Sequence, residues 1–253
     1  MDLTFIATNP QFNSDARLSY NIPVLHDSTG NPAMFLLKMG QREHMEQFRK
    51  GLLYMNTLNY FRELDGDSAR ADRFEGVTHI FQPKDIIMRL SAPGFGEIAI
   101  GSEDLAAATT FSMNSESCCN VFCLHAITAP VNGPIFPSEH EWFGDSTVLV
   151  LNTQDFLSRV LVAAKAKNFT VKGNLVDYYD VNTYTGKLDR FRKSKRFAHQ
   201  REYRIAIESP GTEPLALKIG DITDITSEVI PFSDANNVFK FSEDDVRAAA
   251  LSW

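Results

Sequence analysis

The 253-residue chain has few cysteines and lacks any long apolar run. Its three cysteines, Cys118, Cys119 and Cys123, are clustered and odd in number, so we expect reduced thiols rather than a disulfide framework. Residues 1–11 lack the basic start and apolar stretch of a signal peptide. No stretch approaches the ~18 apolar residues of a membrane span. These absences predict a cytoplasmic protein that does not bind membranes.

The sequence also lacks an overall positive charge. Its net charge of -7 argues against non-specific attraction to nucleic acid or to an anionic membrane. Residues 186–204 are the exception, because eight Lys and Arg there face two acidic residues, giving +6 and leaving -13 for the remainder. This asymmetry predicts one binding region for an anionic partner.

Motifs of several enzyme classes are absent. The chain has no glycine-rich dinucleotide fingerprint, no phosphate loop and no serine in a nucleophile elbow, so Rossmann enzymes and hydrolases lose their usual support. The acidic run at residues 65–75 invites a calcium-loop interpretation. An EF-hand loop that begins at Asp65 needs an oxygen ligand at position five, Gly at six and Glu at twelve. The sequence has Ala69, Arg70 and Gly76 there.

The cysteines and His125 are soft metal ligands close together in the sequence. Zinc ligands usually come as separated pairs that converge tetrahedrally, and this cluster lacks that spacing. Strand alternation would place Val121, Cys123 and His125 on one face, which favours a buried cysteine-rich strand. We therefore expect no metal.

Apolar and turn patterning predicts an α+β protein with an irregular arm over residues 1–33 and one domain over residues 34–253. Helices are expected over residues 41–50, from a cap at Asn56 or Thr57 to residue 64, over 155–167 and after Ser242. A hairpin turn is expected at residues 93–96. Strands are expected at residues 34–39, 52–55, 77–82, 86–91, 97–100, 121–127, 147–151, 175–181, 202–208, 215–219 and 222–229.

The most informative segment is residues 197–207. Strand alternation would place Gln200, Glu202 and Arg204 on one face. A carboxylate between an amide and a guanidinium is held in place and kept ionised, and it can stabilise a developing cation. The alternative is a solvated edge strand with an exposed Glu–Arg pair.

A basic stretch precedes this strand. Its cations interleave with Phe191 and Phe197, a mixture suited to phosphate contacts and base stacking. The alternative is a soluble charged loop. Its position directly before the candidate strand favours a loop that meets a substrate. The candidate target-binding residues are Arg192, Lys193, Lys195, Arg196 and Phe197.

These motifs resemble the ADP-ribosyltransferase-like superfamily, particularly bacterial and phage-defence toxins with an Arg-Ser-Glu style of active site. The triplet at residues 200–202 is similar to the family's Gln/Glu-x-Glu motif, and residues 193–199 to its target-recognition loop. Residues 110–112 resemble its Ser-Thr-Ser element. The strand at residues 35–40 lies where the family places an NAD-gripping basic residue, here Lys38 instead of Arg. The likeness spans about residues 34–230.

The resemblance implies a split β-sandwich of two mostly antiparallel sheets with flanking helices, and transfer of ADP-ribose from NAD with release of nicotinamide. Glu202 would stabilise the oxocarbenium-like state, Gln200 would orient the acceptor, and Ser112 would position Glu202. The residues implied for NAD binding are Lys38, Gly40, Tyr54, Tyr60, Arg70 and Thr110.

The resemblance leaves the acceptor open between nucleic acid, with RNA favoured by the basic loop, and protein. Such a toxin of a phage-defence, toxin–antitoxin type would need an antitoxin protein in its own cell. Two other interpretations remain. One is a catalytically silent relative that binds nucleic acid or protein, and the other is a metal-dependent nuclease using Asp65, Asp67 and Asp72.

Overall fold

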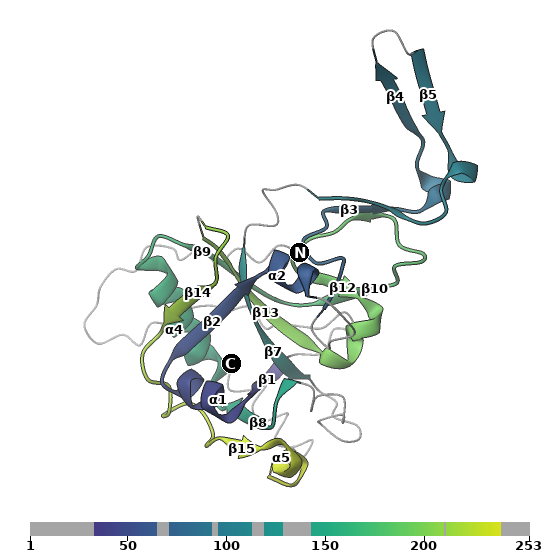
Figure 1. Cartoon of the computed structure of the whole chain (residues 1–253). Helices are drawn as coiled ribbons and strands as arrows, with labels where there is room; N and C mark the ends of the chain where they lie inside the picture. Colours follow the sequence, from purple (N-terminus) through teal and green to yellow (C-terminus); the bar gives the residue numbers. More distant parts are fainter. Residues whose placement is uncertain are drawn as a thin grey trace.

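The computed structural model of the chain describes residues 33–64, 71–92, 96–112, 119–128, 143–209 and 211–238. It is an α+β structure with mostly antiparallel sheets and few helices, which confirms the fold class expected from the sequence. In the described part of the chain, β10 and β12 run parallel and the other strand pairs are antiparallel (Figure 1). None of the described helices has the length and apolar character needed to cross a membrane.

Along the chain, runs of strands are interrupted by a few helices and 3-10 turns. The strands are β1 (Ala33–Gly40), β2 (Leu52–Thr57), β3 (His79–Phe81), β4 (Met88–Ala92), β5 (Gly96–Ile100), β6 (Thr109–Phe111), β7 (Asn120–Thr128), β8 (Ser146–Val150), β9 (Thr170–Leu175), β10 (Asp177–Tyr179), β11 (Gly186–Lys187), β12 (Arg192–Ser194), β13 (Glu202–Glu208), β14 (Leu215–Lys218) and β15 (Ile230–Pro231). The helices are α1 (Arg42–Arg49), α2 (Leu58–Glu63), α4 (Thr153–Lys165) and α5 (Phe232–Val238), with 3-10 turns η1 (Pro83–Asp85), η2 (Ser102–Asp104) and η4 (Lys195–Gln200).

Strand β7 is the branch point of the eight-stranded sheet. One edge pairs with β13 over residues 120–125. The opposite edge pairs with β2 at residues 120–121 and with β1 at residues 125–128. The strands β1 and β2 therefore diverge, and in the described part of the chain residues 122–124 pair with β13 alone.

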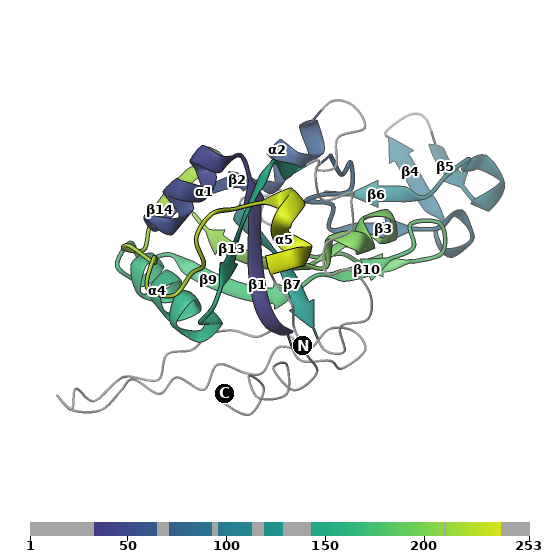
Figure 2. The same ribbon diagram turned by 90° about the horizontal axis from the view of Figure 1, so that it is seen from below.

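Where β1, β7 and β8 lie side by side, apolar side chains are buried on both faces of the sheet. Leu36, Ala126 and Val148 face the main core, whereas the neighbouring Leu37 and Ile127 face a second cluster that contains residues of α5. Seen from below, α5 lies over β1 and α4 lies beside β9 (Figure 2). Burial on both faces explains why these strands read as nearly continuous apolar runs.

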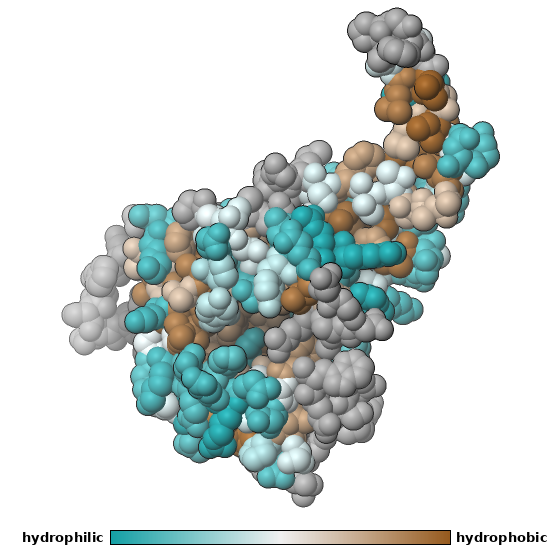
Figure 3. Space-filling model, in the orientation of Figure 1, coloured by the Kyte–Doolittle hydropathy of each residue, from teal (hydrophilic) through white to brown (hydrophobic). Residues whose placement is uncertain are grey.

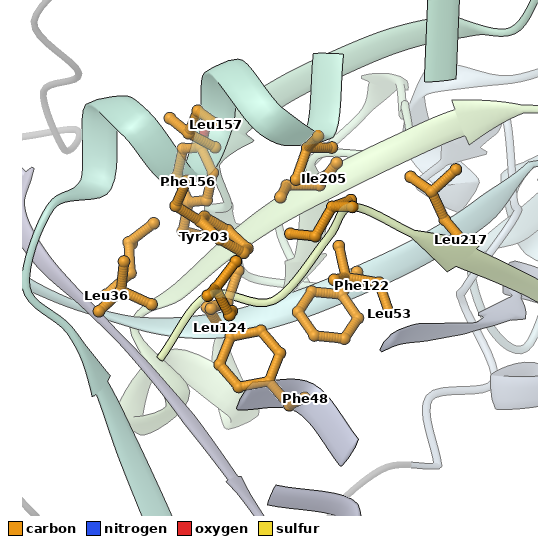
Figure 4. Close-up of a cluster of buried hydrophobic side chains, with 14 of the residues drawn as sticks. Leu36, Phe48, Leu53, Phe122, Leu124, Phe156, Leu157, Tyr203, Ile205 and Leu217 are labelled. Carbon is orange, nitrogen blue, oxygen red and sulfur yellow. The ribbon is translucent and has the colours of Figure 1, made fainter. Parts of the chain in front are cut away.

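Helix α4 shows how local sequence produces the main core. Asn152 caps the helix by accepting a hydrogen bond from the Asp155 backbone N–H at 3.0 Å. Phe156, Val160 and Ala164 follow at helical spacing and are at most 1% exposed. Figure 4 shows the cluster they join, in which side chains of the sheet meet those of α1 and α4. The expected strand and helix at residues 147–167 are therefore confirmed, with the helix beginning and ending two residues earlier.

The hairpin of β4 and β5 stands away from the body of the molecule (Figure 1). Its cross-strand pairs place Met88 opposite Ile100 and Leu90 opposite Ile98, so one face is apolar. Leu90 and Ile98 are 57% and 60% exposed, and the brown colour of Figure 3 marks this strip. The expected hairpin is confirmed, although residues 93–95 of its turn lie outside the described residues.

Some expected elements differ from the structure. The strand expected at residues 222–229 is wrong, because this segment is turn-rich and contributes only an isolated bridge between Thr226 and Val150. Asp221 Oδ1 accepts the Thr223 backbone N–H at 2.9 Å, which closes a local turn instead of extending the chain. The strand expected at residues 175–181 is divided between the end of β9 and β10.

Several short strands were not predicted from the sequence. Two other expected segments lie outside the described residues. The sequence did not predict β6, β11, β12 or β15, because two- to three-residue strands leave too little alternation to detect. Most of the six-residue strand β9 was also missed. The helix expected after Ser242 and residues 1–32 of the arm lie outside the described residues, while Ala33 begins β1. The single domain over residues 34–253 stays a prediction.

We predict that the main core, and not the hairpin face, sets the stability. Phe156→Ala should lower the free energy of unfolding by about 3–5 kcal/mol, because it removes a fully buried ring that contacts Phe48 edge-on. Leu90→Ala should change it little, because that side chain already meets solvent. Urea unfolding of both variants measures the difference, and equal losses would contradict this account of the core.

Candidate active site

Glu202 begins strand β13 on the face of the sheet that opens to a cleft. Its backbone N–H donates to the Tyr178 hydroxyl at 2.9 Å, just after Arg201 turns the chain with a left-handed φ of 41°. The register pairs Glu202 with His125 and Arg204 with Cys123. The expected strand at residues 202–208 is confirmed, and Glu202 and Arg204 share a face.

Gln200 reaches the same cleft by a different route from the one expected. It does not belong to the strand, because residues 195–200 form η4. Its side chain is nevertheless buried beside Glu202 and lines the cleft. The structure therefore brings Gln200, Glu202 and Arg204 together as the sequence suggested, with Gln200 placed by a helical turn.

Four buried charges surround this point. Arg204 donates Nε to Glu202 Oε1 at 2.6 Å, and its two terminal nitrogens donate to the Glu75 carboxylate at 3.0 and 2.7 Å. Lys193 Nζ lies 3.2 Å from Glu202 Oε2 and 3.8 Å from Glu75 Oε1. All four residues are at most 6% exposed. We call these two acids and two cations the buried charge cluster, and its formal charge is zero.

The cluster fixes the ionisation of Glu202. Burial alone raises the pKa of its carboxyl, but the charges of Arg204 and Lys193 and hydrogen bonds from Arg204 and Cys123 hold it well below its usual range. Burial raises the pKa of the Cys123 thiol to about 12, so the thiol stays protonated and donates to Glu202. The pKa of Lys193 is raised, because Glu202 and Glu75 outweigh its desolvation.

The cleft has a volume of about 560 Å³, which is within the range of ~300–1,000 Å³ typical of small-molecule sites. Charged and polar groups meet at its floor, and aromatic and apolar side chains form much of its wall. Lys38 lies between the two, donating to the Cys123 carbonyl at 2.8 Å with its ammonium 4.2 Å from the centre of the Phe122 ring. The aromatic lining residues are Phe48, Tyr54, Tyr60, Phe61, Phe122 and Phe143.

His125 belongs to this floor. It is 2% exposed, lines the cleft, and its Nδ1 lies 2.8 Å from the Gln200 carbonyl oxygen. A carbonyl oxygen can only accept, so Nδ1 carries the hydrogen, and in the neutral ring Nε2 is then an acceptor. The cleft thus combines an anionic carboxylate, an amide, an imidazole and an ammonium.

Most of the expected NAD-binding residues lie in the cleft. Lys38 and Gly40 of β1 and the two tyrosines, Tyr54 and Tyr60, are part of its lining. The tyrosines are 58% and 42% exposed, which places them at an accessible part of the wall instead of the core. Arg70 lies outside the described residues.

Ser112 and Thr110 are placed elsewhere. Thr110 belongs to β6 in the separate β11–β3–β6 sheet, and Ser112 follows that strand. Both are exposed, and neither is part of the cleft lining. The structure therefore does not bring the expected supporting serine to Glu202.

The basic segment is partly neutralised within the protein. Lys193 belongs to the buried charge cluster, and Arg192 contacts the Tyr184 hydroxyl and lies 3.6 Å from Asp177. Arg196 donates to the Ala71 carbonyl at 2.8 Å, but Arg196 and Lys195 are both exposed. Part of the +6 charge seen in the sequence is thus used internally.

Phe197 packs inside the protein. It is 5% exposed, and its ring lies 4.6 Å from Lys193 Nζ and 4.5 Å from the Arg196 guanidinium carbon. The ring stacks with the protein's own cations and in this structure does not meet solvent, where a base would have to stack. The expected stacking role of Phe197 finds no support in this placement.

Sequence reasoning missed three residues of the site. Glu75 was considered only as part of an acidic run, and Cys123 and His125 only as residues that pack or bind metal. The sequence pattern that could have identified Cys123 and His125 is the alternation of the strand now seen as β7. It places both side chains on the face that Glu202 and Arg204 share. Glu75 gave no signal, because it lies 129 residues from its partner Arg204 in a segment without a strand or helix.

The structure describes only some of the metal-ligand candidates. In the part of the chain that the structure describes, no group of three or more His, Cys, Asp or Glu side chains is arranged to hold a metal ion. Asp72 is 1% exposed and accepts the Phe74 backbone N–H at 3.0 Å. Cys118, Asp65 and Asp67 lie outside the described residues.

Comparison with known proteins gives no further guide. No protein-family model, curated protein or solved structure matches the chain. The chemistry of the cleft must therefore be inferred from its own residues.

We predict that the buried charge cluster is a major determinant of stability. Arg204→Met leaves two carboxylates buried with one cation, which should lower the free energy of unfolding by about 3–5 kcal/mol. Lys50→Met removes an exposed ion pair with Asp221 and should leave stability unchanged within error. Chemical denaturation compares them, and an Arg204→Met variant as stable as Lys50→Met would contradict the cluster's role.

A second prediction concerns acid. Because the pKa of Glu202 is lowered in the folded protein, its stabilising contribution is complete above the usual value of 4.5 and is lost as the pH falls below it. The wild type should therefore lose stability more steeply than Glu202→Gln between about pH 4.5 and pH 3. Denaturation at a series of pH values measures this, and parallel curves would show that the carboxyl titrates normally.

Proposed function

We propose that this chain is an ADP-ribosyltransferase that binds NAD in the cleft beside Glu202. The observation that carries the proposal is a buried glutamate, held ionised, at the first position of a central strand and at the floor of a 560 Å³ cleft. Departure of nicotinamide leaves positive charge on the ribose. A fixed carboxylate stabilises that charge without reorganising during the reaction.

The proposed reaction is a substitution at the ribose C1′ of NAD. The bond between C1′ and the nicotinamide nitrogen breaks, and its electron pair goes to nicotinamide. Nicotinamide therefore departs as a neutral molecule. The acceptor atom then donates a lone pair to C1′ and loses its proton. Glu202 hydrogen-bonds the ribose and stabilises the oxocarbenium-like state, and Gln200 orients the acceptor.

The rest of the cleft supports a dinucleotide. Lys38 is the cation proposed for the pyrophosphate, although its ammonium cannot form the two parallel bonds of an arginine fork. Tyr54 and Tyr60 are proposed to stack on nicotinamide or adenine, which their exposure allows. Ser112 is not part of the cleft lining. We therefore assign the role of positioning the Glu202 carboxylate to Arg204, which donates a hydrogen bond to it.

The strand arrangement is compatible with the split β-sandwich of the ADP-ribosyltransferase-like superfamily. The divergence of β1 and β2 along one edge of β7 is the feature that supports it. The two strands contribute Lys38 and Tyr54, so the proposed NAD site lies where they separate.

The acceptor proposed is nucleic acid, with RNA favoured over protein. Its support is narrower than the sequence suggested, since Lys193 and Arg204 are neutralised in the buried charge cluster. The exposed cations Lys187, Lys195, Arg196 and Arg201 remain for an anionic acceptor. A toxin that modified RNA in its own cell would need an antitoxin protein, as in phage-defence systems.

One observation favours a second candidate, a catalytically silent module of the same fold that binds nucleic acid or protein. The Glu202 carboxylate already receives hydrogen bonds from Arg204 and Lys193, as a purely structural ion cluster would require. Such a module releases no nicotinamide and binds its target with salt-sensitive affinity.

We predict that the wild type consumes NAD and that Glu202→Ala does not. Incubation with labelled NAD and cell extract should release nicotinamide and label an acceptor. Loss of the carboxylate should lower the rate of nicotinamide release about 100-fold or more. Glu213→Ala, which removes an exposed glutamate outside the cleft, should match the wild type. Equal labelling by wild type and Glu202→Ala would refute the mechanism, and no labelling by the wild type would favour the silent module.

A further inference from the structure

Lys193 is buried where sequence reasoning expected an exposed cation. It lies in β12, which pairs in parallel with β10, and the residue is 6% exposed. Its Nζ donates to Gln200 Oε1 at 2.8 Å and to Glu202 Oε2 at 3.2 Å. One ammonium therefore joins both side chains of the Gln200-x-Glu202 pair.

This contact fixes which way the Gln200 amide points. An ammonium group has three donors and no acceptor, so the amide oxygen, and not the amide nitrogen, must face Lys193. The amide NH₂ then points away from Lys193. The backbone of Gln200 is restrained separately, because its carbonyl lies 2.8 Å from His125 Nδ1.

Arg204 does not perform the same task. Its guanidinium is shared between the Glu75 carboxylate, Glu202 Oε1 and the Arg190 carbonyl. By contrast, the hydrogen bond from Lys193 Nζ links a buried cation to the side-chain oxygen of Gln200. Loss of Lys193 would leave Glu202 with Arg204 and would remove this hydrogen bond from the Gln200 amide oxygen.

We propose that Lys193 is a positioning residue of the site, which sets the orientation of the Gln200 amide and holds the Glu202 carboxylate against the cleft. The inference rests on the proposed ADP-ribosyltransferase function. The sequence predicted that Lys193 binds the target. In this proposal Lys193 instead holds the side chains of Gln200 and Glu202 in place. Positioning of this kind contributes to the rate of the chemical step and leaves substrate affinity unchanged.

The test compares Lys193→Met, Lys193→Arg and a control variant, Lys167→Met, in steady-state nicotinamide release; Lys167 is exposed and lies outside the cleft lining. Lys193→Met should lower kcat about 100-fold with an unchanged KM for NAD, because a preorganised contact is lost. The acid limb of its kcat–pH profile should shift to higher pH than in the wild type, because removing a cation raises the pKa of Glu202. Lys193→Arg restores the charge in a different geometry and should be intermediate, and Lys167→Met should equal the wild type.

The outcomes separate this inference from the proposed function. An active wild type with unchanged kcat and pH profile in Lys193→Met would overturn the role of Lys193 and leave the transferase proposal standing. If circular dichroism shows Lys193→Met to be unfolded, Lys193→Arg decides, and wild-type kcat in that variant would overturn the inference. A wild type that releases no nicotinamide would end both proposals.

Discussion

The structure depends most on the mutual neutralisation of four buried charges, Glu75, Lys193, Glu202 and Arg204. Each charge would be costly in the interior alone, and a buried pair stripped of one partner is typically destabilised by about 3–5 kcal/mol. Their short contacts make the set tolerable. Because the four residues come from three separated parts of the chain, the same contacts also join the loop before β3, strand β12 and strand β13.

The cluster links fold to chemistry. A stable core could have been built with apolar residues at these positions, and such replacements are often neutral or stabilising. Keeping an ionised carboxylate at the floor of a cleft is therefore better explained by a need for charge there than by stability. Divergence of β1 and β2 opens the space above it, and the aromatic wall supplies surfaces on which flat rings can stack.

The parts of the fold that sequence predicted well are those with a strong local signal. Strand β13 and helix α4 were recognised because alternation and 3.6-residue spacing are long enough to read, and the cap at Thr57 was recognised by its side chain. The segment at residues 222–229 failed because Ile222, Ile225 and Val229 are buried by turns at irregular spacing, not by a strand.

The site was predictable only in part for the same reason. Gln200 and Glu202 are close in sequence, so local pattern found them. The burial of Lys193 and the position of Glu75 beside Lys193 and Arg204 depend on tertiary contacts, which no local pattern encodes. A run of cations consequently looked like a surface for nucleic acid, whereas two of its members, Lys193 and Arg204, neutralise carboxylates inside the protein.

The most direct test of the central claim, that the cleft beside Glu202 is an NAD site, is a crystal structure of the Glu202→Gln variant grown with saturating NAD. The account predicts density for the dinucleotide in the cleft, with the nicotinamide ribose against residue 202 and the pyrophosphate near Lys38. An empty cleft, or NAD bound only elsewhere on the protein, would contradict it.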